Sequence, residues 1–484
     1  MNIIKKLSGK FNSLPLTFRA SFVYLCVSVL QKGLSFLTTP IFTRLLTSSE
    51  FGTVSVYLSL EQLIGTVAMF CLSAGCFDIG MQDYKEDRDK FCFSLLVLSN
   101  VITFLCAGLF FIAYPFIKDY LGVPFRLLLV MFVVFLFEPA FSFWTRRERF
   151  EYHYKKPGIF VALSSILASV AAVVCILCFP QDKLSARIFG QFIPLIFLYI
   201  FFWLYLGKKS NFKVEKKYIK FAFAFNLPLI PHYLSSYVLN SSDRLMINGM
   251  VGSSQAAYYS LAYSVSAIVT VVWTAINSSL VPFVLEKYEQ KKYKDVSDVV
   301  LPILTFFAAI CLTLILVAPE IVRLLGTEEY GESVYVIPPV IGGVFFQALY
   351  YVFTNVLYYL KKPKIVMYAS ISSALLNLLL NYICIKMFGY IAAGYTTLIC
   401  FCLQALIDYI VVRKIMKQDV YDRKNLLILA SAVIVVSILC NFIYSFFFIR
   451  CIILILILAV LWIKRDIVLS LFKKRNKNNK ESYL

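Results

Sequence analysis

The feature of this sequence that most limits its fold is the recurrence of apolar runs of about twenty residues along the whole chain. As a helix rising about 1.5 Å per residue, each run is long enough to cross the roughly 30 Å hydrocarbon core of a bilayer. Of the 484 residues, 60% are hydrophobic and 15% are charged, whereas soluble domains contain about 45–50% and about 25%. The sequence therefore predicts an all-α polytopic membrane protein with little room for a soluble catalytic domain.

The apolar runs and the basic residues together predict a topology. We expect fourteen transmembrane helices, beginning near Phe18, Phe51, Phe91, Phe125, Gly158, Ile188, Ala222, Tyr258, Pro302, Val336, Ile365, Ile391, Leu426 and Ile452. Every second connection is rich in Lys and Arg, and these connections hold 37 of the 47. By the positive-inside rule, both termini are then cytoplasmic. The net charge of +20 thus reflects topology and indicates anionic membrane lipids as partners rather than nucleic acid.

Sequence motifs argue against an enzyme. The chain contains no Walker A motif, dinucleotide-binding glycine run or nucleophile elbow. Its CxxC pattern, Cys175 to Cys178, lies inside an apolar run, and its two histidines, His153 and His232, are too few for a metal site. We therefore expect a non-enzyme with no metal and no cofactor.

Two sequence matches predict an internal repeat. Lys155-Lys156-Pro157 matches Lys361-Lys362-Pro363 at an offset of 206 residues, and Ser48-Ser49-Glu50 matches Ser253-Ser254-Gln255 at an offset of 205. The offset spans six expected helices, an even number, so the halves are predicted to be parallel repeats. We expect two six-helix bundles plus two C-terminal helices. The predicted domains are an N-terminal lobe (1–207), a basic cytoplasmic linker (208–221), a C-terminal lobe (222–418), transmembrane helices 13 and 14 (419–472) and a basic cytoplasmic tail (473–484).

Polar residues at helical spacing mark four of the expected spans. The stripes are Ser28, Lys32, Ser35 and Thr39; Ser55, Ser59, Gln62 and Thr66; Tyr233, Tyr237, Asn240 and Arg244; and Tyr259, Tyr263, Ser266, Thr270 and Asn277. Small polar residues often join transmembrane helices. Because the stripes recur in repeat-related helices, we expect them to line a cavity suited to a hydroxyl-rich cargo such as sugar.

Two charges on the first and second expected spans need an explanation. Lys32 and Glu61 lie at similar predicted depths, and an unpaired charge there costs about 2.5–3.5 kcal/mol. They are predicted to form an ion pair in which Glu61 binds a transported proton. The alternative is that Lys32 extends toward the interface while Glu61 is protonated among polar neighbours.

Three segments resemble the polysaccharide transporters, the lipid-linked oligosaccharide flippases of the MOP exporter superfamily. They are the segment from Lys32 to Tyr57 with Pro40 and Glu50-Phe51-Gly52, the segment with Pro228, Ser242-Asp243-Arg244 and Gly252, and Lys361-Lys362-Pro363 leading into Ile391-Ala392-Ala393-Gly394. The resemblance covers most of residues 15–412. It implies a MATE-like fold working by alternating access. It also implies that the cargo is an undecaprenyl-diphosphate-linked O-antigen or capsular repeat unit, flipped across the bacterial inner membrane, with a polysaccharide polymerase as a candidate partner.

A diphosphate cargo would require cations. The predicted substrate-binding residues are Lys32, Arg44, Arg244, Asn240, Tyr237, Tyr263 and Gln62, with Arg126 and Arg187 as weaker cationic candidates, and the predicted ion-coupling residues are Glu61 and Asp243. The coupling ion, H⁺ or Na⁺, stays open. So does the structural alternative that arginines at helix ends anchor the interface and that Arg244 pairs with Asp243. A MATE-type multidrug or cation antiporter is the main rival function, and a membrane glycosyltransferase or polymerase is the enzyme rival.

The basic-residue pattern makes a testable prediction about orientation. In a background cleared of accessible thiols, cysteines introduced in the Lys208 to Lys220 segment should be protected from an impermeant external thiol reagent, because that segment is predicted to be cytoplasmic. Cysteines placed beside Lys183 should be labelled in intact cells. The reverse labelling pattern would contradict the predicted orientation.

Overall fold

The computed structural model describes residues 16–73, 75–151, 153–417 and 420–463, and all of its regular elements are helices. Eleven helices in these residues are long and apolar enough to cross a membrane. Large apolar side chains are exposed on them, and Phe116, for example, is 88% exposed. A contiguous apolar surface of this kind is stable in lipid rather than water. The protein is therefore a multi-pass membrane protein.

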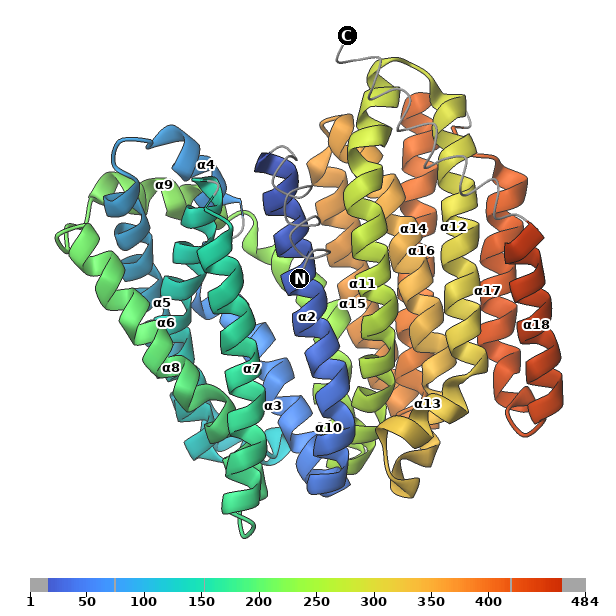
Figure 1. The fold of residues 1–484 in the computed structure, drawn as a ribbon, viewed down its shortest axis with the longest axis horizontal. Helices are drawn as coiled ribbons and strands as arrows, with labels where there is room; N and C mark the ends of the chain where they lie inside the picture. The colour runs from blue at the N-terminus through green and yellow to red at the C-terminus, as the bar shows by residue number, and fades with distance from the viewer. Residues whose placement is uncertain (1–15, 74, 152, 418–419, 464–484) are drawn as a thin grey trace, which may run out of the picture. The chain divides into compact units, whose positions relative to one another are not determined.

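The chain divides into two compact units, Met1–Ala257 and Tyr258–Leu484, called unit 1 and unit 2 here. Unit 1 contains α2 (Leu16–Leu45), α3 (Ser48–Ala68), α4 (Cys76–Asp83), α5 (Arg88–Leu121), α6 (Phe125–Phe150), α7 (Lys155–Cys178), α8 (Lys183–Lys209), α9 (Lys216–Asn226), α10 (Ile230–Met250) and the first turn of α11 (Ser253–Glu289). Its long helices run along one another (Figure 1).

Unit 2 contains the rest of α11 and seven further α-helices with one short 3₁₀ helix. These are α12 (Tyr293–Leu316), α13 (Ala318–Leu325), η1 (Glu328–Tyr335), α14 (Ile337–Tyr359), α15 (Pro363–Phe388), α16 (Ala392–Met416), α17 (Arg423–Ile443) and α18 (Phe447–Ile463). Buried amides join two of them: Asn377 Nδ2 on α15 donates to Thr397 Oγ1 on α16 at 3.1 Å. Such bonds satisfy polar groups that lipid cannot hydrate.

The expected helices are present, and three of them fall outside the eleven candidate spans. The second and fourteenth expected spans correspond to α3 and α18, and the seventh corresponds to α10. The count of fourteen membrane crossings and the parallel repeat therefore stay predictions. The domain boundaries at 207/208, 221/222, 418/419 and 472/473 also stay predictions, and the last lies outside the described residues.

The predicted start of the seventh span, near Ala222, is wrong, because the helix begins at Ile230. The apolar run near Ala222 belongs to α9, and α10 begins at Ile230 after a short turn that contains Pro228. Proline lacks a backbone N–H, so Pro228 cannot donate the hydrogen bond that would continue α9. The Lys208 to Lys220 segment, predicted as a basic linker, contains the end of α8 and the first half of α9.

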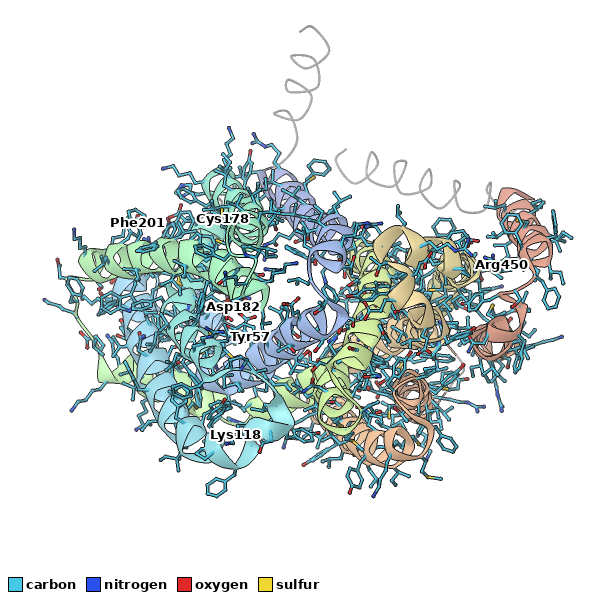
Figure 2. All side chains as sticks on the ribbon, turned by 90° about the horizontal axis from the view of Figure 1, so that it is seen from below. Tyr57, Lys118, Cys178, Asp182, Phe201 and Arg450 are labelled. Atoms are coloured by element: carbon cyan, nitrogen blue, oxygen red, sulfur yellow. The ribbon has the colours of Figure 1, made fainter. Side chains whose placement is uncertain are left out.

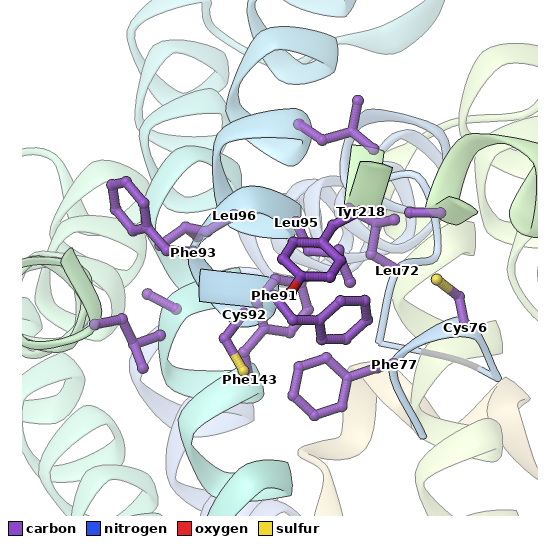
Figure 3. Close-up of a cluster of buried hydrophobic side chains, with 14 of the residues drawn as sticks. Leu72, Cys76, Phe77, Phe91, Cys92, Phe93, Leu95, Leu96, Phe143 and Tyr218 are labelled. Atoms are coloured by element: carbon purple, nitrogen blue, oxygen red, sulfur yellow. The ribbon is translucent and has the colours of Figure 1, made fainter. Parts of the chain in front are cut away.

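Aromatic packing fixes α9 against α4, α5 and α6 (Figure 3). Tyr218 of α9 is fully buried, and its ring lies 5.5 Å from that of Phe91 in an edge-to-face arrangement. Its hydroxyl donates to Asp87 Oδ2 at 3.1 Å. Hydrogen bonds from Lys90 and from Tyr218 lower the pKa of Asp87 below its ordinary value. The basic helix α9 is therefore held on its apolar side while its lysines remain exposed.

An ion pair connects the last helix to the body of unit 2. Arg450 of α18, labelled in Figure 2, binds both carboxylate oxygens of Glu320 at 2.8 Å and donates to the carbonyl oxygen of Leu316 at 2.8 Å. The bidentate geometry is the strongest that arginine and carboxylate form. The two C-terminal helices are thus part of unit 2.

The start of α3 packs unusually close to the start of α11. Thr47 and Glu50 form a capping box at the beginning of α3. One turn later, a Cβ atom added to Gly52 would lie 1.8 Å from the carbonyl oxygen of Ser253 and 3.2 Å from the amide nitrogen of Ala257. Beside it, Ser48 Oγ donates to Ser254 Oγ at 3.0 Å. The approach of these two backbones therefore requires glycine at position 52.

This close approach predicts different effects for two glycine substitutions. Gly52→Ala should destabilise the purified protein by about 1–3 kcal/mol, because the methyl group forces backbone atoms apart. Gly108→Ala on α5, where no atom lies within 4 Å of an added Cβ, should be neutral or stabilise by up to about 1 kcal/mol through helix propensity. Thermal unfolding in detergent measures both. Equal stability of the two variants would contradict the packing described for α3.

Candidate functional site

A polar cavity of about 510 Å³ lies within unit 1, between α2, α3, α6, α7 and α8. Hydroxyl and amide side chains form much of its wall: Gln31, Ser35, Thr38, Ser142, Thr145, Ser164, Ser165, Ser169 and Gln191. Gln31 Nε2 donates to Ser165 Oγ at 3.1 Å, which joins α2 to α7 across the wall. Hydroxyls and amides both donate and accept hydrogen bonds, so this wall suits a ligand that also does both.

One cation faces this cavity. Arg187 of α8 is 9% exposed, its Nη1 donates to Gln191 Oε1, and its guanidinium lies 3.9 Å above the ring of Phe42. It lies in the second turn of α8, whose start is capped by Asp182 through a hydrogen bond from the Ser185 amide. Stacking and the single amide acceptor hold the guanidinium in place and leave other N–H groups for a ligand.

One carboxyl group lies on the cavity wall and another lies close to it. Glu138 of α6 and Tyr199 of α8 line the cavity. Glu61 of α3 lies close enough to Glu138 to interact with it electrostatically, and Tyr199 interacts with both. Two carboxyls that approach one another inside an apolar bundle favour a shared proton or a bound cation over two negative charges. The cavity thus combines one arginine with one carboxyl group on its wall and a second close to it.

The face of α2 that lines the cavity differs from the predicted one. Ser35 belongs to the cavity wall as expected, but its companions are Gln31 and Thr38 rather than Lys32 and Thr39. Lys32 is exposed, and it forms no ion pair with Glu61 in the structure. A helix advances 3.6 residues per turn, so Ser35 fits both stripes and spacing alone does not choose between them. The ion pair predicted for Lys32 and Glu61 is therefore wrong for this conformation.

Gln62, from the predicted stripe of α3, contacts α10 at Ser241, a residue outside the predicted α10 stripe. Ser241 Oγ donates to Gln62 Oε1 at 2.7 Å, which bridges the two helices. On α10, Asn240 Nδ2 donates to the carbonyl oxygen of Ser236 at 2.7 Å, and Arg244 Nη1 donates to the carbonyl oxygen of Asn240 at 3.2 Å. Tyr237 is 40% exposed on the same helix.

The remaining predicted residues occupy three separate places. Arg44 Nη1 donates to the carbonyl oxygen of Pro40 at 2.8 Å, near the end of α2. Asp243 is 1% exposed within α10. Tyr263 lies in unit 2, with its ring 5.2 Å from that of Tyr259. The functional roles of all nine predicted residues stay predictions.

Sequence reasoning missed Glu138 and gave Arg187 too little weight. Each belongs to a short polar stripe at helical spacing that the four predicted stripes do not include: Glu138 with Ser142 and Thr145, and Arg187 with Gln191. The charge itself was a second signal, because an ionisable residue inside a membrane segment is expensive and usually functional.

A second cluster, at the end of α6, involves one of the two histidines. His153 Nδ1 lies 3.2 Å from Glu148 Oε2 and 3.6 Å from Glu151 Oε2, and the three ligand atoms lie within 4.8 Å of one another. Glu151 is also 3.5 Å from Arg147 and 3.9 Å from Arg88. Those arginines already balance the carboxylate charge, so the arrangement is explained as an ion-pair network.

The sequence of the chain matches a known family. Residues 18–288, more than half of the chain, match the family described as polysaccharide biosynthesis protein. The chain belongs to that family. Residues 228–383 also match the family described as MatE. These matches agree with the resemblance seen in the polar and proline-containing segments and place the chain in the MOP superfamily.

Individual relatives are distant. Lsg locus putative protein 1 of Haemophilus influenzae is 24% identical over 220 residues, which are 44% of this chain and 55% of that protein, so the match spans about half of the relative's length. A protein of Haloferax volcanii named probable low-salt glycan biosynthesis flippase Agl15 is 22% identical over 418 residues, which are 80% of this chain and 82% of that protein.

A solved structure shares the fold. The lipid II flippase MurJ in an inward closed conformation superposes with a TM-score of 0.68 and 16% sequence identity, over 93% of this chain and 100% of that chain. At this identity the likeness establishes the fold alone. Together with the family matches, it identifies this chain as an all-helical member of the MATE-like and MurJ-like architecture.

The contact between Arg187 and Gln191 makes a prediction about stability. Gln191→Leu should destabilise the protein by about 1–3 kcal/mol, because it removes the acceptor from a buried guanidinium. Adding Arg187→Met should recover most of this loss, since no unpaired charge then remains. Thermal unfolding of the single and double variants tests the pair. If the double variant is no more stable than Gln191→Leu, the two side chains are not coupled.

Proposed function

We propose that this protein is a flippase that moves a lipid-linked oligosaccharide from the cytoplasmic to the periplasmic face of the bacterial inner membrane. The observation that carries the proposal is the hydroxyl- and amide-lined cavity of unit 1 with Arg187 on its wall, in a chain of the polysaccharide biosynthesis family. Sugar hydroxyls match the wall, and a phosphate oxygen matches the guanidinium. The relative named as a glycan biosynthesis flippase and the fold shared with a lipid II flippase support this function.

The finer features of the proposal are those predicted from the sequence and its family resemblance. The cargo is an undecaprenyl-diphosphate-linked repeat unit of O-antigen or capsule, and transport proceeds by alternating access with H⁺ or Na⁺ coupling. The chain crosses the membrane fourteen times as two parallel six-helix repeats plus two helices, with both termini cytoplasmic. Exposed lysines of α9 contact anionic headgroups, and a polysaccharide polymerase receives the flipped unit. The protein has no catalytic role in this scheme.

Within this function, the charged residues have separate roles. Arg187 binds phosphate together with Lys32, Arg44 and Arg244, while Gln62, Tyr237, Asn240 and Tyr263 contact sugar. Glu61 and Asp243 act in ion coupling. The neighbouring Glu138 extends the coupling role, because its carboxyl interacts with that of Glu61 and also faces the cavity.

A second candidate function is a MATE-type multidrug or cation antiporter. Glu138, Phe141 and Tyr199 on the cavity wall favour it, since carboxylates and aromatic rings attract organic cations. Arg187 opposes it, because a buried guanidinium on the same wall repels a cationic ligand. Purified protein in vesicles distinguishes the two functions: a flippase moves a fluorescent lipid-linked oligosaccharide across the bilayer, and an antiporter exchanges ethidium for protons.

The proposal predicts the phenotype of cation substitutions. In a strain deleted for the gene, lipid-linked sugar should accumulate on the cytoplasmic face, and the intact gene should restore surface polysaccharide. Arg187→Gln, Lys32→Gln and Arg244→Gln should each lower surface polysaccharide at least about tenfold, the effect of about 1.4 kcal/mol lost from a limiting step. Lys32→Arg should restore part of it.

Lys386→Gln serves as the matched control. Lys386 is an exposed cation near the end of α15, outside the cavity wall, and its loss should leave polysaccharide unchanged. All variants are compared at equal membrane abundance. Normal polysaccharide in a quadruple neutralisation of Lys32, Arg44, Arg187 and Arg244 would mean that these cations do not handle the phosphates.

A further inference from the structure

Unit 2 contains a buried acid, Asp408, that is not part of the cavity in unit 1. Asp408 of α16 is fully buried, and α16 packs along α14 and α15. Its neighbours are polar but uncharged. Thr354 Oγ1 of α14 donates to Asp408 Oδ2 at 3.2 Å. An ionised carboxylate at such a site would need several donors or a cation to offset its desolvation.

The same site contains a network of polar side chains. Gln404 lies one helical turn before Asp408 on α16, and its Nε2 donates to Ser370 Oγ of α15 at 3.2 Å. Tyr350 of α14 is hydrogen-bonded to both Ser370 and Thr354. Four polar side chains from three helices thus lie around one carboxyl group.

Two acceptors in this network lack a donor. Asp408 Oδ1 and Gln404 Oε1 are both buried, and the described residues provide neither with a hydrogen-bond partner. The side chains are four residues apart on one helix and therefore occupy neighbouring positions on its surface. These two unsatisfied acceptors leave the network short of a donor. A proton on the carboxyl group provides the missing donor, whereas an ionised carboxylate adds a negative charge beside an unpaired acceptor.

The described neighbours of Asp408 include no cation that would neutralise an ionised carboxylate. The titratable group that faces it from α14 is Tyr350, and α15 contributes the uncharged Ser370. Along the described chain, the side-chain interactions of Asp408 are the hydrogen bond from Thr354 and the contact with Tyr350, and no cation takes part. Neutralisation by arginine or lysine, as found for Glu320 with Arg450, is therefore not available to Asp408.

We propose that Asp408 is a proton-binding site in unit 2, and that taking up and releasing this proton is coupled to transport. In the structure shown, the network around Tyr350, Thr354, Ser370 and Gln404 accommodates the protonated acid. Release of the proton leaves a charge that α14, α15 and α16 cannot solvate in their present packing, so release requires the three helices to separate locally or to admit water. The coupling part of this inference rests on the proposed transport function, and the proton-binding part does not.

Infrared difference spectroscopy of the full-length protein in lipid nanodiscs tests proton binding directly. Glu61→Gln with Glu138→Gln serves as the background, so that carboxyls of unit 1 do not contribute. A protonated carboxylic acid has a carbonyl stretching band distinct from that of a carboxylate. We expect this band to disappear as the pH is raised, to be absent in Asp408→Asn, and to return at a shifted position in Asp408→Glu. Asp298→Asn, an exposed acid on α12 of the same unit, is the matched control and should leave the band unchanged.

Transport by otherwise wild-type protein tests coupling. The flipping rate of a fluorescent lipid-linked oligosaccharide in vesicles should depend less on pH in Asp408→Asn, where the unit 1 acids remain, and keep its full pH dependence in Asp298→Asn. The proposal is overturned if no band assigned to Asp408 appears at any pH, or if sodium at constant pH removes the band, which would identify a metal-cation site. Unchanged pH dependence in Asp408→Asn overturns the coupling. Absence of flipping by every variant, the wild type included, would instead reject the proposed function, while the infrared result would still decide whether Asp408 binds a proton.

Discussion

A polar or charged group inside an apolar helical bundle must be paired, hydrated or neutral, because lipid offers it no hydrogen bond. This protein uses each solution in a different place. Arg450 is paired with Glu320, Arg187 faces a polar cavity, and the side-chain amide of Asn377 joins two helices through Thr397. The positions of these groups determine where the bundle is tight and where it opens.

The cavity of unit 1 lies where the helical bundle opens, and the helices around it explain which residues form its wall. Five helices contribute to its wall, and none of them presents a fully polar face. Four of them provide one to three hydroxyl or amide side chains each, and α3 provides Leu58. A wall of this kind binds a ligand through many weak hydrogen bonds, and the buried arginine adds one strong contact. Such a site is suited to a cargo that must be bound and then released.

Much of the helical plan could be predicted from the sequence, because it depends on local signals. Apolar runs, the Lys-Lys-Pro segments at the starts of α7 and α15, and the serines that begin α3 and α11 are all local features of the chain. The choice of helix face could not be predicted at Ser35, which fits two stripes, because neighbouring helices decide which stripe is buried. Nor could Glu138 be linked to Glu61, since their proximity arises only when α3 and α6 pack in the same unit. The division between α9 and α10 was indicated by Pro228 but hidden by the apolar residues on both sides of it.

The contact between Gly52 and the start of α11 has a consequence for the history of the chain. An offset of 205 residues, the one that relates Ser48 to Ser253, also relates Gly52 to Ala257, and these two residues are in contact. If the halves arose by duplication, a residue that touches its own counterpart lay on the twofold axis of an ancestral homodimer. In that ancestor any mutation at this position would have appeared on both sides of the interface at once. After fusion, one copy could become alanine while the other remained glycine, so the single chain gained an asymmetry that a dimer of identical subunits cannot encode.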